Sequence, residues 1–325
     1  NLKSDEGQRI LRALVGRSDV VIDSFLPAAA RRLGVDDATL RSIKPDLVHV
    51  TISGYGEAGP LKDRPGYDLM LQAFTGMMSI TGEPGGGPIR AGASFIDMTT
   101  GILAYAGASG ALFAKASGRT GGEHVKVSLL ETGMALLGYH LVDVAATGRQ
   151  PERGGSGVWH LVPYQAFRTR DGSILAGATN DASWQRMCTA LEAPELADNA
   201  DYANAASRIE NREVLLARLG EIFLARTTAD WMERLEAARV PCAPIHDLPA
   251  ALRHPQVAAT RMLVESTDAR GVPRKLAGVP IKMSAMPASI EGVPPYLGQH
   301  TAEILSTELG LDSKYIEQLR EWGVV

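Results

Sequence analysis

Hydrophobic and polar positions follow one another in the first half of the chain as expected for helices packed on a buried sheet. Apolar residues at positions 10, 11, 14 and 15 repeat at helical spacing after Ser4, which we expect to cap that helix. Residues 20–22 form a short apolar run and residues 47–52 are largely apolar and β-branched, which indicates strands covered on both faces. Because such helices and strands alternate, we expect an α/β lobe with a parallel, Rossmann-like sheet.

The same pattern continues beyond the second strand. Helices are expected at residues 67–80, 99–116 and 129–146, with a strand at 123–128. The helix at 99–116 is rich in alanine and glycine, so it has little side-chain bulk and allows another backbone to approach closely.

The pattern changes in the middle of the chain. Residues 149–157 are polar and glycine-rich, which indicates a linker or a mobile loop. Two predicted strands and several helices then suggest a separate α+β lobe, and the chain becomes proline-rich and extended from about residue 275. We therefore expect a large α/β lobe from residues 1–150 and 275–325, and a small α+β lobe from residues 158–274.

Composition excludes several classes of protein. The 325 residues are 45% hydrophobic and 22% charged, with a net charge of −4 and no basic stripe, so we expect no nucleic-acid partner. No apolar run approaches the roughly 18 residues that span a bilayer, and no signal peptide is recognisable, so we expect no membrane partner and a cytoplasmic location. Cys188 and Cys242 are isolated, which favours buried thiols. Because the chain opens on Asn1, we expect that part of the large lobe precedes it.

Common catalytic motifs are absent from the sequence. It has no phosphate loop, no nucleophile elbow of the G-x-S-x-G type and no H-E-x-x-H. Seven histidines are scattered without ligand spacing, so we expect no metal site.

The residues that could carry chemistry gather between Ser53 and Gly101. Ser53 ends a predicted buried strand, and ligands of open α/β sheets bind beyond the carboxyl ends of strands. Asp97 is a lone carboxylate at the start of the alanine- and glycine-rich helix. Its simplest interpretation is a helix cap. The alternative is a nucleophile, since small neighbouring residues would let a bulky ligand approach.

An ordered series of motifs resembles CoA-transferase family III, the CaiB/BaiF family. It begins with Gly54-Tyr55-Gly56, Gly59-Pro60 and Arg64-Pro65-Gly66-Tyr67-Asp68, continues through Asp97 and the turn at 118–122, and closes with Leu297-Gly298-Gln299-His300-Thr301. The resemblance covers nearly the whole chain. It implies two interlocked ring-like subunits in a homodimer, an acyl-CoA and a carboxylic acid as substrates, and no permanently bound cofactor.

The resemblance also assigns roles to residues. Asp97 would be the covalent nucleophile that carries CoA as an aspartyl thioester. An aspartate suits this role because it is ionised at neutral pH and needs no base, although the anhydride it forms must be kept from water. The other implied site residues are the active-site neighbours Tyr55 and Glu57, the closing loop Gly154, Gly155, Ser156 and Gly157, and the CoA-binding residues Arg32, Ser24 and Ser53.

Two departures and two rival functions stay open. Ser24 and Ser53 replace the asparagine and lysine that formyl-CoA transferase, one family member, has near CoA. A racemase of α-methylacyl-CoA is one rival, but Tyr67 stands where the racemase pattern has histidine, and a phenol is a poor base at neutral pH. A non-catalytic acyl-CoA-binding chain is the other. The residues themselves do not identify the acyl donor. From the family resemblance we expect succinyl-CoA.

Overall fold

The computed structural model describes residues 1–290 and 292–325, and its contacts divide the chain into two units. Unit 1 comprises Asn1–Thr81, Gly87–Glu152 and Pro295–Val325. Unit 2 comprises Gly82–Gly86 and Arg153–Pro294. The prediction had the large lobe resume at residue 275, whereas residues up to Pro294 belong by contact to unit 2.

Unit 1 is built on a parallel sheet with strand order β1-β2-β3. The strands are β1 (Val20–Asp23), β2 (Val48–Ser53) and β3 (Glu123–Ser128). In the observed register Ile22 lies opposite Val50 and Val50 lies opposite Val125. The parallel sheet of an α/β protein, predicted from the two apolar runs, is confirmed.

Helices precede, connect and follow these strands. They are α1 (Asp5–Arg17), α2 (Pro27–Leu33), α3 (Asp37–Ile43), α4 (Asp68–Phe74), α5 (Met77–Ile80), α6 (Phe95–Ala116), α7 (Leu129–Leu136), α8 (Tyr139–Thr147), α16 (Thr301–Leu309) and α17 (Ser313–Glu321). The predicted cap of α1 is confirmed, since the Ser4 side chain accepts a hydrogen bond from the backbone of Gly7.

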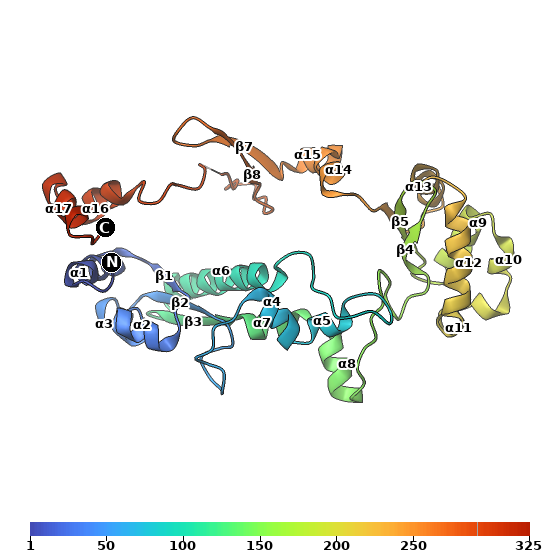
Figure 1. Cartoon of the computed structure of the whole chain (residues 1–325), viewed down its shortest axis with the longest axis horizontal. Coiled ribbons are helices and arrows are strands. Elements are labelled where there is room, and N and C mark those ends of the chain that lie inside the picture. Colours follow the sequence, from blue (N-terminus) through green and yellow to red (C-terminus); the bar gives the residue numbers. More distant parts are fainter. Residues whose placement is uncertain (291) are drawn as a thin grey trace. The chain divides into compact units, whose positions relative to one another are not determined.

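The small residues of α6 allow it to lie close to the sheet. Ala104, Ala108 and Ala111 pack against the buried Val48 and Val50 of β2. A Cβ atom added to Gly107 would lie 2.5 Å from Cγ1 of Val125, so only glycine fits where the helix crosses β3. In Figure 1, α6 lies along one side of the sheet, and α2 and α3 lie along the other.

The opposite face of the sheet is covered by α1 and α3. Val15 of α1 and Leu40 of α3 form a buried cluster with Leu47, and Val21 of β1 packs against it. One face of β2 therefore meets α6 through valines, while its other face carries His49 and Thr51, which are buried as well.

Two predicted helices are broken. The segment 67–80 is divided between α4 and α5 at Gly76, and the segment 129–146 is divided between α7 and α8 at Gly138. Both glycines have positive φ, 87° and 53°, which glycine adopts without steric penalty. The break between α7 and α8 bends the chain by 80°, and this pair meets the length and hydropathy requirements of a membrane span only when taken together. No single helix in the described part of the chain meets them.

The two ends of the chain meet in unit 1. Ile10 of α1 forms a buried cluster with Leu305, Ile316 and Leu319 of the last two helices. The N-terminal amine of Asn1 also donates a hydrogen bond of 2.6 Å to the backbone oxygen of Val324. The last two helices, α16 and α17, thus pack on the first helix of the same unit.

Unit 2 contains an antiparallel sheet of order β4-β5-β6 and a separate hairpin of β7 and β8. Its elements are β4 (Tyr164–Arg168), β5 (Ser173–Gly177), α9 (Asp181–Ala190), α10 (Pro194–Ala197), the 3₁₀ helix η1 (Ala200–Tyr202), α11 (Ala205–Glu210), α12 (Arg212–Leu224), α13 (Thr228–Ala237), β6 (Cys242–Pro244), α14 (Leu248–Arg253), α15 (Pro255–Thr260), β7 (Leu263–Thr267) and β8 (Pro273–Ala277).

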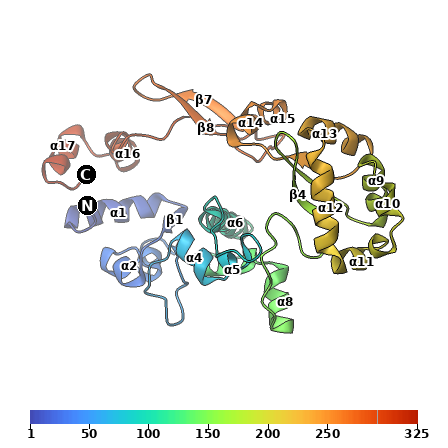
Figure 2. The same cartoon turned by 45° about the vertical axis from the view of Figure 1, so that its right-hand side comes forward.

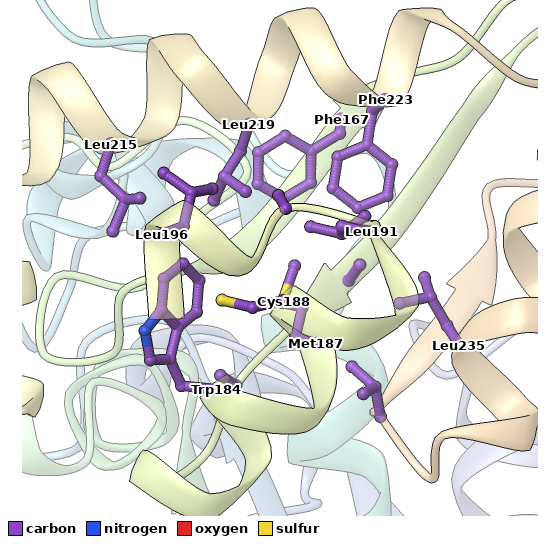
Figure 3. Packing of buried hydrophobic residues seen from close by; sticks show 14 of the residues in the cluster. Phe167, Trp184, Met187, Cys188, Leu191, Leu196, Leu215, Leu219, Phe223 and Leu235 are labelled. Atoms are coloured by element: carbon purple, nitrogen blue, oxygen red, sulfur yellow. The ribbon is translucent and has the colours of Figure 1, made fainter. Parts of the chain in front are cut away.

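The core of unit 2 lies between its helices and β4 and β5. Figure 3 shows Leu215, Leu219 and Phe223 projecting from α12 towards α9. The Phe223 ring stacks on Phe167 of β4, with ring centroids 4.5 Å apart. The views in Figures 1 and 2 agree that α9 and α12 lie near each other in this unit. Unit 2 therefore has a hydrophobic core of its own.

Candidate active site

A cavity of about 290 Å³ in unit 1 lies beyond the carboxyl ends of β1 and β2. It is called the Asp97 cavity here. Its lining residues come from the β1–α2 turn, the end of β2, the following loop and the starts of α6 and α7: Ser24, Phe25, Leu26, Pro27, Thr51, Ile52, Ser53, Gly54, Gly56, Glu57, Lys62, Pro65, Gly66, Tyr67, Asp97 and Leu129. This is the position where open α/β sheets bind ligands.

Asp97 is the third residue of α6, and its side chain is exposed to the cavity. Partial burial raises the pKa of the Asp97 carboxyl above its ordinary value, and the negative charge of Asp68 raises it further. A carboxylate with a raised pKa is more basic than an ordinary aspartate. Its ionised form is therefore a stronger nucleophile.

The simpler interpretation of Asp97, a helix cap, does not fit the hydrogen bonds at the start of α6. Ser94 holds the cap position without a side-chain capping bond among the described residues. The backbone N–H groups of Ile96 and Asp97 donate instead to Oδ2 of Asp68, at 2.9 and 3.2 Å. Because Asp68 caps the helix, the Asp97 carboxylate is left free to face the cavity.

One predicted active-site neighbour and two predicted CoA-binding residues line the same cavity. Ser24, Ser53 and Glu57 all line it together with Asp97. Glu57 forms an ion pair of 2.7 Å with Lys126 of β3, and the Ser53 hydroxyl accepts a hydrogen bond from the backbone of Gly56. These contacts fix the loop after β2. The structure brings the side chains together, and their roles in catalysis or CoA binding stay predictions.

Tyr55 is buried beside the start of α6, and its role as a neighbour of the active site stays a prediction. Tyr55 is 6% exposed and belongs to a buried cluster with Leu71 and Ile96. It is not among the described residues that line the Asp97 cavity. It meets Phe74 edge to face, with ring centroids 5.3 Å apart. Tyr55 therefore packs against Ile96 in the first turn of α6.

Arg32 lies on α2 and is exposed. It is not among the described residues that line the Asp97 cavity. The adjacent Arg31 lines a second cavity of about 450 Å³. The two cavities adjoin, since both are lined by Phe25, Glu57 and Lys62. The proposed contact of Arg32 with CoA phosphate stays a prediction.

The predicted closing loop belongs to unit 2, whereas Asp97 belongs to unit 1. Within unit 2, the loop is held against residues 82–86. The backbone N–H of Gly155 donates to Gly82, and the Arg153 guanidinium donates to the backbone oxygen of Gly86 at 2.7 Å. The Ser156 hydroxyl accepts from the backbone of Ala166 in β4. A glycine-rich segment is thus tied to a second glycine-rich segment that precedes Asp97 in the sequence.

A cluster of titratable side chains at the wall of the second cavity was not predicted. His49 lies between two carboxylates, with Nε2 at 2.8 Å from Asp23 and Nδ1 at 3.3 Å from Asp37. The ring of His124 stacks on His49 with centroids 4.5 Å apart, and its Nε2 lies 2.9 Å from the hydroxyl of Thr51. Sequence spacing gave no signal, because the register of β2 and β3 places the two histidines opposite each other.

The pKa values of the two histidines in this cluster are shifted in opposite directions. Burial lowers the pKa of His49, but the hydrogen bonds and charges of Asp23 and Asp37 outweigh burial, so that the pKa is raised. For His124 burial dominates and the pKa is lowered. The potential ligand atoms of Asp37, His49 and His124 lie within 4.8 Å of one another. The expected absence of a metal therefore stays a prediction.

Comparison with known proteins connects this geometry to one family. Residues 1–301 match CoA-transferase family III. The chain is 35% identical over its full length to an acyl-CoA transferase of Fusarium pseudograminearum, of which it covers 71%. It is 32% identical over its full length to the human succinyl-CoA:glutarate CoA-transferase, of which it covers 74%. A crystal structure of a CaiB/BaiF family protein from Brucella suis superposes with a TM-score of 0.83 at 30% identity, covering 95% of this chain and 80% of that one. Agreement in sequence and in fold across both units shows that the chain belongs to CoA-transferase family III.

Proposed function

We propose that this protein transfers CoA from an acyl-CoA thioester to a free carboxylic acid, with Asp97 as the covalent nucleophile. The observation that carries the proposal is the Asp97 carboxylate itself. It faces a cavity at the ends of the strands, and its pKa is raised. Asp68, not Asp97, accepts the hydrogen bonds that cap α6. Family membership supports the same reaction.

The proposed reaction has two symmetrical halves. An oxygen of Asp97 attacks the thioester carbonyl, the C–S bond breaks, and CoA leaves as a thiolate from a mixed anhydride. The thiolate then attacks the aspartyl carbonyl and displaces the first acid as its carboxylate, which leaves an aspartyl-CoA thioester. The acceptor carboxylate repeats both steps in reverse order. No proton is transferred, so no general base is required.

The intermediates need protection from water, since hydrolysis of the anhydride or of the aspartyl thioester would waste the donor. The loop at residues 154–157 is the proposed cover. Its turn is fixed by a hydrogen bond of 3.0 Å from the backbone of Gly157 to that of Gly154, and it contains three glycines. Closure over Asp97 is part of the proposal.

The proposed substrates are dicarboxylic acids and their CoA thioesters, with succinyl-CoA as donor. Two observations support this class. The human relative is named for succinyl-CoA and glutarate, which are both derived from dicarboxylic acids. Lys62 is the positively charged side chain among the described residues that line the Asp97 cavity, and a cation there would attract a second carboxylate.

A transfer assay tests the proposed function. The protein is mixed with succinyl-CoA and glutarate, and CoA esters are followed by liquid chromatography and mass spectrometry. We expect glutaryl-CoA and succinate to form in equal amounts, with ping-pong kinetics and little free CoA. Release of free CoA alone would indicate hydrolysis. Exchange of the α-hydrogen of a 2-methylacyl-CoA in heavy water, without transfer to any acid, would favour the racemase.

The proposal includes a homodimer in which the subunits interlock. One face of α6 packs on the sheet, but its other face exposes large apolar side chains, with Met98, Ile102, Tyr105 and Phe113 each 64–68% exposed. A second copy of the chain would cover such a face. Sedimentation velocity is expected to give a dimer that persists on dilution to low micromolar concentration, and a monomer there would contradict interlocking.

A further inference from the structure

The start of α6 is held by a pair of buried side chains from α4. Oδ2 of Asp68 accepts the backbone N–H groups of Ile96 and Asp97, and its Oδ1 accepts a hydrogen bond of 2.5 Å from Nε2 of Gln72. Asp68 is 7% exposed and Gln72 is fully buried. A buried carboxylate with three donors is a strong and specific anchor, because its charge strengthens every bond it accepts.

Gln72 extends this anchor to the segment before the helix. Its Oε1 accepts a hydrogen bond of 2.9 Å from the backbone N–H of Ala91. Asp68 and Gln72 lie one helical turn apart on α4, so their side chains meet on one face of that helix. The backbone is therefore fixed at Ala91 and again at Ile96 and Asp97, on both sides of the bend that enters α6.

We infer that Asp68 and Gln72 are positioning residues for Asp97, holding the backbone of Asp97 so that its carboxylate faces the cavity. This inference rests on the proposed function of Asp97 and adds two residues to it. Asp68 itself is not among the described residues that line the cavity, so it acts through Asp97. The physical reason is preorganisation: an attacking atom displaced by about 1 Å can lose on the order of 10²-fold in rate.

Asp68 has a second effect on Asp97 because it is charged. A negative charge beside Asp97 opposes ionisation and contributes to the raised pKa of the Asp97 carboxyl. The other titratable side chains that line the cavity are Glu57, Lys62 and Tyr67. Replacing Asp68 by asparagine keeps a side-chain oxygen that can accept both backbone N–H groups but removes the charge. The Asp97 carboxyl should then ionise at lower pH.

The test compares Asp68→Asn, Asp68→Ala and Gln72→Ala with the control Asp312→Asn. Asp312 also caps a helix of unit 1, accepting a hydrogen bond from Tyr315 at the start of α17. Steady-state transfer of CoA is measured from pH 4 to pH 8, which gives kcat and the KM for the acyl-CoA. We expect Asp68→Ala and Gln72→Ala to lose on the order of 10²-fold and 10-fold in kcat. KM should change less than kcat, and Asp312→Asn should match the wild type.

The Asp68→Asn variant distinguishes an effect on Asp97 from a structural role, because a structural role alone would not change the pH at which Asp97 titrates. For Asp68→Asn we expect the acid limb of the pH profile to shift to lower pH, and the ¹³C carboxyl titration of Asp97 by NMR to shift in the same direction. An unchanged titration and pH profile in Asp68→Asn, with normal kcat in Gln72→Ala, would overturn the inference. The NMR titration needs no turnover. A wild type without transfer would therefore count against the proposed function alone, while the titration still decides whether Asp68 acts on Asp97.

Discussion

Replacing Asp97 with asparagine should abolish CoA transfer while leaving acyl-CoA binding within about 3-fold of the wild type. The carboxylate supplies the attacking oxygen, and asparagine has no comparable nucleophile. The loss should be about 10⁴-fold or more in kcat, as expected when a covalent nucleophile is removed. The fold should persist, because α6 is capped by Asp68 rather than by Asp97. Transfer is measured by chromatography of CoA esters, and binding by calorimetry with the acyl-CoA.

Asp5→Asn is the matched control, since Asp5 is an exposed aspartate of the same unit that is not among the described residues lining either cavity. It should retain transfer within a small factor. If Asp97→Asn retained transfer, another group would be the nucleophile. If it lost binding and turnover together, Asp97 would act in substrate binding instead of covalent catalysis.

Replacing His49 with alanine should destabilise the protein, and more so at mildly acidic pH. His49 is 1% exposed and bridges Asp23 and Asp37, so its loss leaves a buried carboxylate without its partner. Breaking such a pair typically costs about 3 kcal/mol in the free energy of unfolding. The pKa of His49 is raised on folding, so its contribution is full below the ordinary value of 6.5 and declines as pH rises through the folded value. The pKa of Asp23 is lowered on folding, and the contribution of Asp23 to stability therefore declines in strong acid instead.

Urea unfolding at pH 6 and pH 8.5 measures this difference, with His124→Ala as the control. The pKa of His124 is lowered on folding, so its neutral form is favoured and its contribution should increase with pH. The two variants should thus show opposite pH trends. An equal loss of stability for His49→Ala at both pH values would contradict a charged His49.

Local patterns in the sequence were enough to predict the sheet of unit 1 and its main helix. Residues 47–52 are largely apolar and β-branched, and the first four residues of β2 are buried, so that both faces of the strand are covered as that pattern implies. The alanine- and glycine-rich helix was expected to approach another backbone closely, and Gly107 does so at Val125. The breaks at Gly76 and Gly138 were missed because glycine within a periodic helical pattern is often tolerated.

Contacts between distant residues could not be predicted in the same way. The interpretation of Asp97 as a helix cap was reasonable from its position, and it fails because Asp68, which is 29 residues away in the chain, accepts the same N–H groups. The histidine cluster depends on strand register, which joins residues 49 and 124. The hairpin of β7 and β8 was not predicted, since most residues of both strands are exposed and the apolar signal is weak.

The central claim, that Asp97 carries CoA covalently, is tested most directly by mass spectrometry of the protein and of its peptides. The protein is incubated with succinyl-CoA in the absence of an acceptor, quenched and digested. We predict an adduct with the mass of CoA less one water, located on the peptide that contains Asp97 and absent from Asp97→Asn. An adduct on any other residue, or rapid transfer without an adduct that can be trapped, would contradict the account.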